Sequence, residues 1–370
     1  MRYYIIAGEA SGDLHAANLM KALKKTDSKA KFRFWGGNLM KNVEDNLVKH
    51  YKDLAFMGFF EVVMNLRTII INLRLCKADI KKYQPDCLIF IDYPGFNLRI
   101  AKWAKKEGLK THYYISPQIW AWKESRIAAI KRDVDKMYVI LPFEKGFYED
   151  KHKMPVEFVG HPLIDAITNR MPVNEISFRQ VNGLDEKPII ALLPGSRKQE
   201  INKMLSVMLS IVKYFSGYQF VIAGAPSQDP EFYNSFVKNK NVYFVENATY
   251  DLLSVSYAAL VTSGTATLET ALFKVPEVVC YKTSRISYEI GKRLVKLKYI
   301  SLVNLILDKE VVTELVQDEF NTKRLTKELK CILDIKKREK QFIAYHELET
   351  KLGGQGASQK VAELIYDSLN

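Results

Sequence analysis

Asp92 is the residue best placed for proton transfer, because it comes directly after the apolar run 87–91 and just before Pro94. A carboxylate held at the end of a buried strand can remove a proton from an attacking hydroxyl group, which typically accelerates a reaction by about 10² to 10⁴. An aspartate here can also simply cap the helix that Pro94 would begin. Both roles are compatible with the sequence.

A second polar turn, GEASGD at 8–13, follows the first apolar run of the chain and leads straight into a helical pattern. Such a turn exposes backbone N–H groups at a helix start. It lacks the GxGxxG pattern of dinucleotide sites, and the carboxylates of Glu9 and Asp13 would repel a pyrophosphate. We therefore expect it to face a hydroxyl-rich acceptor, with Ser11 or Asp13 as a helix cap in the alternative interpretation.

Two turns in the second half have the opposite chemistry. PGSR at 194–197 offers backbone N–H groups, the Ser196 hydroxyl and the Arg197 guanidinium, whose planar fork donates two parallel hydrogen bonds to a phosphate. SGTATLE at 263–269 combines a helix start with Glu269, which can accept from sugar hydroxyls. Two such turns on adjacent strands favour a nucleotide site, and tight packing of the helix starts is the structural alternative.

Two further polar positions are weaker candidates. Asp133 and Asp135 form the only close aspartate pair that suggests a metal-dependent transferase, but they follow Lys131-Arg132 and fit a solvated helix-to-strand junction better. We expect no metal and no other cofactor. His161 has no second His or Cys at ligand spacing, so a hinge or cleft hydrogen-bonding role is expected.

The most apolar stretch, 54–75, is interrupted by Glu61, Arg67 and Arg74 and is too short of apolar residues to span a membrane. A core helix is the ordinary interpretation. An acylated substrate would instead justify an exposed surface rich in Met and Phe, with Met57, Phe59 and Phe60 as its contacts.

The elements that must position these residues alternate between short β-branched or aromatic runs and helical patterns, which is typical of βαβ units around a parallel sheet. Strands are expected at 3–7, 32–35, 87–91, 110–115, 136–140 and 156–159, and, after a polar connection, at 189–193, 219–223, 242–245, 259–262 and 277–280. Beyond Ser284 the pattern is purely helical, with a glycine-rich turn at 353–356 before a last amphipathic helix.

The predicted fold is therefore α/β, with two Rossmann-like domains facing across a cleft and a helical C-terminal extension. The expected boundaries are an N-terminal domain at 1–165, a linker at 166–187, a C-terminal domain at 188–350 and a final helix at 351–370, packed on the N-terminal domain or on a partner chain.

Composition restricts the partners. The 370 residues carry a formal charge of +13, which suits a phosphorylated substrate or an anionic lipid surface. No nucleic-acid motif or repeated basic and aromatic run supports nucleic acid. The four cysteines lack metal-ligand spacing and the first residues lack a secretion signal, so a reducing cytoplasm is expected.

The motifs together resemble the lipid-A-disaccharide synthase family, and they occur in the family's order over almost the whole chain. They are GEASGD at 8–13, MGFFEV at 57–62, IDYPGFN at 91–97, SPQIWAW at 116–122, LPFE at 141–144, GHP at 160–162, PGSR at 194–197, SGTATLE at 263–269 and SLVNL at 301–305. The first and fourth are specific to that family. Gly95 and Val303 depart from some relatives, which have an acidic residue and a proline there.

The resemblance implies a glycosyltransferase of the GT-B architecture that transfers diacylglucosamine from its UDP derivative to diacylglucosamine 1-phosphate, with inversion, a β-1,6 link and release of UDP. It implies peripheral association with the anionic inner face of the inner membrane, and a homodimer that exchanges C-terminal helices is compatible with the glycine-rich turn. Asp92 becomes the leading general base, with Glu9 as competitor or orienting partner. The implied acceptor contacts are Ser11, Asp13, Asn97, Met57, Phe59 and Phe60, and the implied UDP contacts are Gly195, Ser196, Arg197, Ser263, Gly264, Thr265, Glu269 and Asn304.

Two other classes of function remain open at this point. A UDP-N-acetylglucosamine 2-epimerase uses the same scaffold without a second sugar, and a non-catalytic lipid-binding or nucleic-acid-binding module would bind without turnover.

Overall fold

The chain forms two compact units, which we call unit 1 (1–169 with 352–370) and unit 2 (170–351). The structure is a computed structural model. It describes residues 1–54, 66–237, 239–285, 288–289 and 297–370. The predicted contacts Met57, Phe59 and Phe60 lie outside the described residues.

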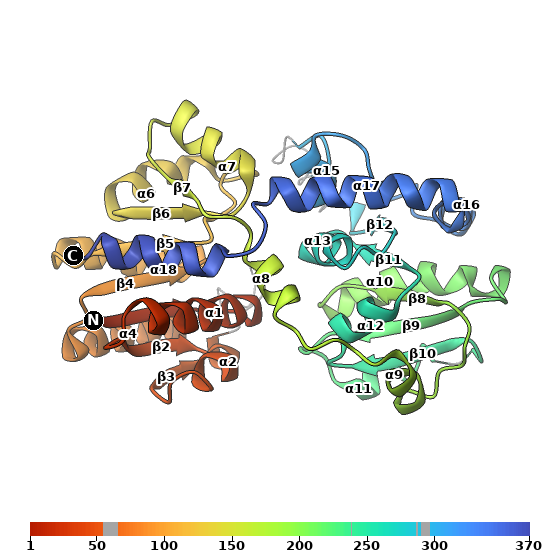
Figure 1. The fold of residues 1–370 in the computed structure, drawn as a ribbon, viewed down its shortest axis with the longest axis horizontal. Helices are drawn as coiled ribbons and strands as arrows, with labels where there is room; N and C mark the ends of the chain where they lie inside the picture. The colour runs from red at the N-terminus through yellow and green to blue at the C-terminus, as the bar shows by residue number, and fades with distance from the viewer. Residues whose placement is uncertain (55–65, 238, 286–287, 290–296) are drawn as a thin grey trace. The chain divides into compact units, whose positions relative to one another are not determined.

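Unit 1 is built on a seven-stranded parallel sheet in the order β3-β2-β1-β4-β5-β6-β7 (Figure 1). The central strands β1 and β4 are apolar and almost entirely buried, as expected where helices cover both faces of a parallel sheet. The strands are β1 Arg2–Ala7, β2 Lys31–Gly36, β3 Leu47–His50, β4 Cys87–Ile91, β5 Thr111–Tyr114, β6 Lys136–Val139 and β7 Glu157–Phe158.

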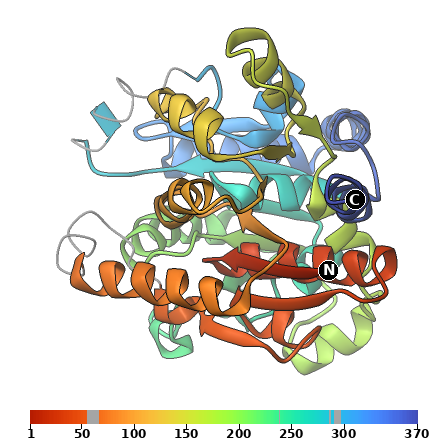
Figure 2. The ribbon, with the colours of Figure 1, turned by 90° about the vertical axis from the view of Figure 1, so that its left-hand side faces the viewer.

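Helices lie on both faces of this sheet. Figure 2 shows α1 and α18 on one face and α4 and α5 on the other, so the first and last helices of the chain lie side by side. The helices of unit 1 are α1 Ala10–Thr26, α2 Asn38–Lys41, α4 Leu66–Tyr83, α5 Pro94–Lys106, α6 Ile127–Asp133, α7 Pro142–Gly146, α8 Pro162–Thr168 and α18 Ala357–Asp367.

Unit 2 repeats the plan with a six-stranded parallel sheet in the order β10-β9-β8-β11-β12-β13. Its strands are β8 Ile189–Leu193, β9 Gln219–Gly224, β10 Val242–Glu246, β11 Ala258–Thr262, β12 Glu277–Tyr281 and β13 Thr313–Val316. Its helices are α9 Glu175–Val181, α10 Lys198–Met208, α11 Pro230–Tyr233, α12 Thr249–Val255, α13 Thr265–Leu272, α15 Leu302–Leu307, α16 Thr322–Leu333 and α17 Ile335–Lys351.

The last helix is fixed to unit 1 by backbone contacts. The Asp165 carboxylate accepts hydrogen bonds from Gly356 N at 2.7 Å and Ser358 N at 2.8 Å, just before and at the start of α18. Gly160 and Gly353 both have positive φ, of 88° and 89°, and a Cβ on Gly353 would lie 3.0 Å from Gly160 Cα. Only glycine permits this close approach of the two backbones.

Each strand predicted from the sequence is present, with ends that differ by at most one residue. The prediction that the chain is purely helical beyond Ser284 is wrong, because β13 lies there and pairs with β12. The strand β3 was not predicted either. Both are edge strands with half-buried, polar sequences, LVKH and TELV, that lack a strand pattern.

Glu277, at the start of β12, is a buried carboxyl group whose two oxygens have no hydrogen-bond partner among the described residues. Burial raises its pKa well above the ordinary value. A raised pKa in the folded state gives stability that is present below the unfolded-state pKa of about 4.3 and is lost as the pH rises towards the folded-state pKa.

We expect the Glu277→Gln variant to escape this pH-dependent loss. Between pH 5 and pH 8 the melting temperature of the parent should fall by at least about 3 °C relative to the variant, measured by thermal unfolding at both pH values. The exposed Glu339→Gln is the matched control. Equal pH dependence in all three proteins would contradict an uncompensated buried carboxyl group.

Candidate active site

Asp92 comes directly after β4, whose last residue Ile91 pairs with Ala7 at the end of β1. Asp92 and Tyr93 have φ values of 41° and 49°, in a left-handed region that non-glycine residues adopt only when their surroundings impose it. The Asp92 carbonyl accepts from Tyr113 Oη at 2.5 Å and from Asn97 Nδ2 at 2.8 Å. The Asp92 backbone is therefore held rigidly in a strained conformation, as at many functional sites.

The Asp92 side chain is half-buried, and its pKa is raised to about 7. Burial is the main cause, the negative charges of Glu9 and then Glu144 add to it, and the Tyr93 N–H group acts in the opposite direction. A carboxylate with a pKa near neutrality can accept a proton and later release it at physiological pH. The alternative role as helix cap is not found, because Tyr93 is the N-cap of α5 and makes no side-chain cap bond.

The turn after β1 lies beside Asp92 because β1 and β4 are neighbours in the sheet. A Cβ on Gly8 would lie 2.3 Å from the Tyr93 ring, so the turn packs directly on the residue that follows Asp92. Glu9 and Ser11 are exposed there. Glu9 is the N-cap of α1, without a side-chain cap bond, so the interpretation of Ser11 or Asp13 as the cap of this helix is wrong.

Asp13 is buried and its carboxylate is already occupied. It accepts from Gly37 N at 2.7 Å, Leu39 N at 3.0 Å and Met40 N at 3.1 Å. The residue thus attaches the turn between β2 and α2 to α1. Its predicted contact with an acceptor stays a prediction.

Asn97 has a similar positioning role on α5. Its Nδ2 group donates to Ile6 O, Ile91 O and Asp92 O at 3.3, 3.3 and 2.8 Å. One buried amide therefore links the carboxyl ends of β1 and β4, where Glu9 and Asp92 follow.

A buried carboxylate on α7 organises the SPQIWAW segment, a role that the sequence motifs did not predict. Glu144 accepts from Ser116 Oγ at 2.6 Å and Trp120 Nε1 at 3.1 Å, and from Ile140 N and Leu141 N at 3.2 and 3.0 Å. The LPFE motif carries an early signal, because a glutamate three residues after the N-cap of a helix is typical of a capping box.

In unit 2 the two predicted anion turns follow adjacent strands, since Leu193 at the end of β8 pairs with Val261 near the end of β11. Gly195 has φ of 99°, and a Cβ there would lie 2.3 Å from Glu200 Oε2. Ser196 N donates to the same Glu200 oxygen at 3.3 Å. Arg197 is exposed and is the N-cap of α10.

The second turn leaves open space above the start of α13. Gly264 is the N-cap, Thr265 is the first helical residue, and both are exposed. Apart from its chain neighbours, no described residue has an atom within 4 Å of a Cβ built on Gly264. Ser263 Oγ donates to Ile300 O at 2.8 Å. An open helix start without a side-chain cap is suited to an anion.

Glu269, on the second turn of α13, accepts from Tyr250 Oη at 2.8 Å. Burial raises its pKa above the ordinary value, and the Tyr250 hydrogen bond acts against that rise. No hydrogen bond to the other carboxylate oxygen is found among the described residues.

The Asn304 side chain is buried and fully used within unit 2. Its Oδ1 accepts from Val311 N and Val312 N, and its Nδ2 donates to Val312 O and Glu314 Oε1. It ties α15 to the segment that leads into β13. Contact with UDP stays a prediction.

His161 is the N-cap of α8, with Nδ1 accepting from Leu163 N at 3.2 Å. The backbone N–H group of His161 donates to Leu352 O at 2.9 Å. Both hydrogen-bond partners of His161, Leu163 and Leu352, therefore belong to unit 1. Burial, with the nearby His15, lowers its pKa to about 3. The ring is therefore neutral and structural in this unit, and a hinge role stays a prediction.

The aspartate pair weighed as a metal site is engaged in ion pairs. Asp133 bonds Arg132, and Asp135 bonds Lys105 and Thr111. Within the described ranges, no three His, Cys, Asp or Glu side chains are grouped as a metal would require. No helix among the described residues has the length and apolar character that crossing a membrane requires.

The fold is shared with solved structures of a UDP-GlcNAc 2-epimerase and a glycotransferase. The structure matches UDP-GlcNAc 2-epimerase from Neisseria meningitidis with a TM-score of 0.72 and 14% identity, over 99% of this chain and 100% of that one. It matches the glycotransferase of kitacinnamycin with a TM-score of 0.66 and 12% identity, over 100% and 99%. These likenesses confirm the predicted α/β fold class, which epimerases and GT-B glycosyltransferases share.

The family follows from the sequence comparisons. A family model described as lipid-A-disaccharide synthetase matches residues 3–366. The lipid-A-disaccharide synthase of Syntrophus aciditrophicus is 39% identical over 368 residues, covering 97% of this chain and 95% of its own. That of Coxiella burnetii is 38% identical, covering 98% and 97%. The chain belongs to the lipid-A-disaccharide synthase family and is a glycosyltransferase of lipid A biosynthesis.

Proposed function

We propose that the chain transfers diacylglucosamine from its UDP derivative to the hydroxyl group of diacylglucosamine 1-phosphate, forming a β-1,6 link with inversion and releasing UDP. Membership of the synthase family supports the substrate classes. A single displacement with inversion requires a base on the attacking hydroxyl group and stabilisation of the departing diphosphate. The residues of the two units divide into these two tasks.

The observation that carries the proposal is the state of Asp92, a half-buried carboxylate at a strand end with a pKa of about 7. In the proposed mechanism it takes the proton of the acceptor hydroxyl group as the bond to the sugar forms. The charge of Glu9 adds to the rise in the Asp92 pKa that burial causes, and Glu9 orients the acceptor. Three further residues contact the acceptor or position the groups that do, namely Ser11, Asp13 and Asn97.

On the donor side, the N–H groups at the start of α13 and the Arg197 guanidinium stabilise the charge that develops on the departing diphosphate. Glu269 accepts from a sugar or ribose hydroxyl group. The contributing residues are Gly195, Ser196, Arg197, Ser263, Gly264, Thr265, Glu269 and Asn304. In the proposed mechanism the fixed positive charge and the N–H dipoles stabilise the departing diphosphate, and no metal ion takes part.

Peripheral binding to the anionic inner face of the inner membrane belongs to the same proposal. On α4 the apolar side chains of Ile70, Ile71 and Leu75 are 48%, 52% and 44% exposed. Arg67 and Arg74 are exposed on the same helix. Apolar side chains beside arginines suit the boundary between lipid headgroups and acyl chains.

The reaction is tested by mass spectrometry of the product formed from synthetic UDP-diacylglucosamine and diacylglucosamine 1-phosphate, with a chelator present. The expected product is the disaccharide 1-phosphate, together with UDP. A parallel incubation with UDP-N-acetylglucosamine alone distinguishes the epimerase alternative, since epimerised product without an acceptor would overturn the transferase proposal. Product only after addition of a divalent metal would overturn the metal-free mechanism.

We expect Arg197→Ala to weaken UDP binding by about tenfold to a hundredfold, because a charge-assisted hydrogen bond to phosphate contributes about 1.5–3 kcal/mol. Isothermal titration with UDP measures this. Arg179→Ala, on α9, is a control that removes an arginine already paired with Glu175. Unchanged UDP affinity in Arg197→Ala would remove Arg197 from the nucleotide site.

A further inference from the structure

A pocket of about 420 Å³ lies on unit 1 at the amino-terminal ends of β5 and β6. Asp92 and the turn at 8–13 follow the carboxyl ends of β4 and β1. Because all these strands are parallel, the pocket is at the opposite edge of the sheet from the proposed transfer site. It is lined by Lys105, Gly108, Leu109, Lys110, His112, Asp135, Lys136 and Ser368.

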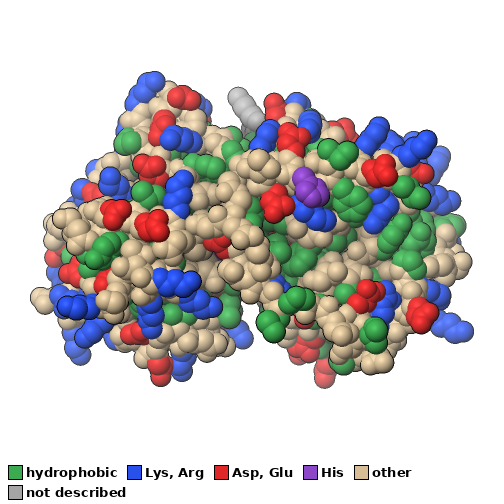
Figure 3. Space-filling model, in the orientation of Figure 1, with side chains coloured by type: hydrophobic (Ala, Val, Ile, Leu, Met, Phe, Trp, Pro, Cys, Tyr) green, Lys and Arg blue, Asp and Glu red, His purple; other side chains and the backbone are tan. Residues whose placement is uncertain are grey.

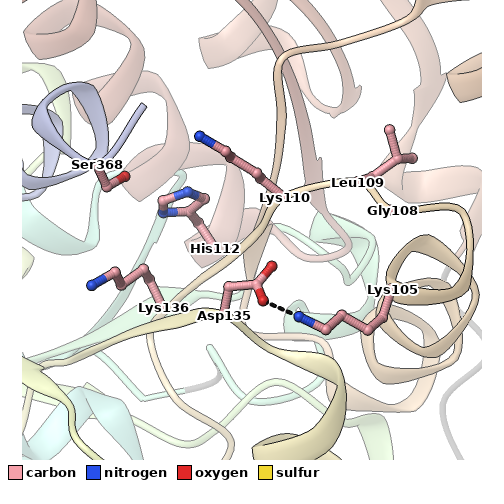
Figure 4. Close-up of a pocket in the computed structure, with 8 residues that line it drawn as sticks. All are labelled: Lys105, Gly108, Leu109, Lys110, His112, Asp135, Lys136 and Ser368. Carbon is pink, nitrogen blue, oxygen red and sulfur yellow. Dashed lines mark hydrogen bonds and ion pairs between the residues drawn. The ribbon is translucent and has the colours of Figure 1, made fainter. Parts of the chain in front are cut away.

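The charges in this pocket do not cancel. Lys105 forms an ion pair with Asp135, whereas Lys110 and Lys136 have no ion pair among the described residues. Figure 4 shows the His112 ring between the Lys110 and Lys136 side chains, with the Lys105–Asp135 pair to the other side. On the face that Figure 3 shows, Lys and Arg side chains are interspersed with Asp and Glu. Two unpaired ammonium groups in one pocket therefore make a local positive site.

His112 gives the pocket a fixed polar wall. The ring is only 2% exposed, stacks on Tyr138 with ring centroids 5.9 Å apart, and has Nδ1 3.0 Å from Tyr138 Oη. The hydrogen bond of the ring is made by Nδ1, and none to Nε2 is found among the described residues. When Tyr138 donates to Nδ1, the proton of the neutral ring is on Nε2, which is then an unused donor.

We propose that this pocket is a second binding site, for a phosphate-bearing anion held by the Lys110 and Lys136 ammonium groups beside His112. Lysine binds phosphate as a mobile point charge, and two lysines match the two negative charges of a phosphate monoester. The volume accommodates a small phosphorylated molecule or the phosphate end of a lipid headgroup. The shared chemistry is the phosphate group, and the two sources are distinguished below.

The position of Ser368 gives the site a structural consequence. Ser368 follows the last residue of α18, and its hydroxyl group donates to Ile365 O of that helix. Because Ser368 also lines the pocket, the end of α18 lies at the pocket rim. A ligand there contacts residues of α5, of the turn before β5, of β5 and β6, and the residue that follows α18. A ligand that binds only the folded form of unit 1 increases the stability of this unit by mass action.

The test follows the His112 imidazole signal by NMR in the full chain, assigned with His112→Gln and recorded with excess UDP. Sodium phosphate and pyrophosphate are titrated at constant ionic strength. We expect a saturable shift, with affinity reduced at least about tenfold in Lys110→Gln/Lys136→Gln. The control is Lys102→Gln/Lys106→Gln, which removes two exposed lysines of α5 that do not line the pocket.

A vesicle arm identifies the source of the phosphate. Phosphatidylcholine vesicles with and without a fifth of phosphatidic acid are sedimented with each protein. Loss of vesicle binding only in the pocket variant, competed by pyrophosphate, assigns the site to a headgroup, whereas a phosphate shift without such loss assigns it to a soluble molecule. The proposal is overturned by the absence of both effects, or by equal effects of the two double substitutions.

Discussion

Replacing Asp92 with Asn is expected to lower the rate of disaccharide formation by about 10² to 10⁴ while leaving UDP binding and folding unchanged. The amide keeps the size of the side chain but cannot take the acceptor proton. The Asp92 backbone conformation is imposed by Tyr113 and Asn97, which the substitution does not touch. Single-turnover rates with both sugars, with circular dichroism and UDP titration alongside, measure the effect.

The pH dependence makes this prediction sharper. The base must be unprotonated, so the rate should rise with pH through the pKa of Asp92, about 7. The Glu9 carboxylate contributes to that raised pKa, so Glu9→Gln should move the midpoint of the rate profile to lower pH. Parent-like turnover in Asp92→Asn, or a midpoint that Glu9→Gln does not move, would exclude this pairing of roles.

Glu144→Ala is expected to lower the free energy of unfolding of unit 1 by at least about 3 kcal/mol, because a buried polar group left without its partner costs about 1–3 kcal/mol. The substitution leaves four donors without an acceptor: Ser116 Oγ, Trp120 Nε1 and the N–H groups of Ile140 and Leu141. Chemical denaturation followed by tryptophan fluorescence measures the loss.

Two variants serve as comparisons for Glu144. Glu144→Gln retains one acceptor oxygen and should lose less stability than Glu144→Ala. Glu186→Ala removes an exposed glutamate and should change stability by less than about 0.5 kcal/mol. If Glu144→Ala unfolds at the same denaturant concentration as Glu186→Ala, the four hydrogen bonds do not stabilise the SPQIWAW segment.

The strands at the centre of each sheet were predictable because burial on both faces requires them to be continuously apolar. CLIFI at β4 and IIALL at β8 are short apolar runs bounded by turn residues. The edge strands β3 and β13 were not predictable from this signal. Each carries charged or polar residues and is recognised only by its pairing with β2 or β12.

The position of the candidate site in the fold was predictable, but the hydrogen-bond partners of several of its residues were not. A carboxylate directly after a buried strand must lie at the carboxyl edge of the sheet, and this places Asp92. The partners of Asp13 and Asn304 were not predictable. Asp13 receives its hydrogen bonds from residues 24 to 27 positions along the chain, and Asn304 receives those to its oxygen from the loop before β13. Such contacts depend on tertiary packing, which no local pattern records.

The division of the chain has a consequence for the order of synthesis. Residues 352–370 leave the ribosome only after all of 170–351, yet they belong to the same unit as 1–169. While unit 2 is translated and can fold, the surface of α1 that α18 later covers is therefore still exposed on the nascent first segment. Ribosome-bound intermediates stalled before residue 352 should be the stage at which this enzyme is most vulnerable to proteases and most dependent on chaperones.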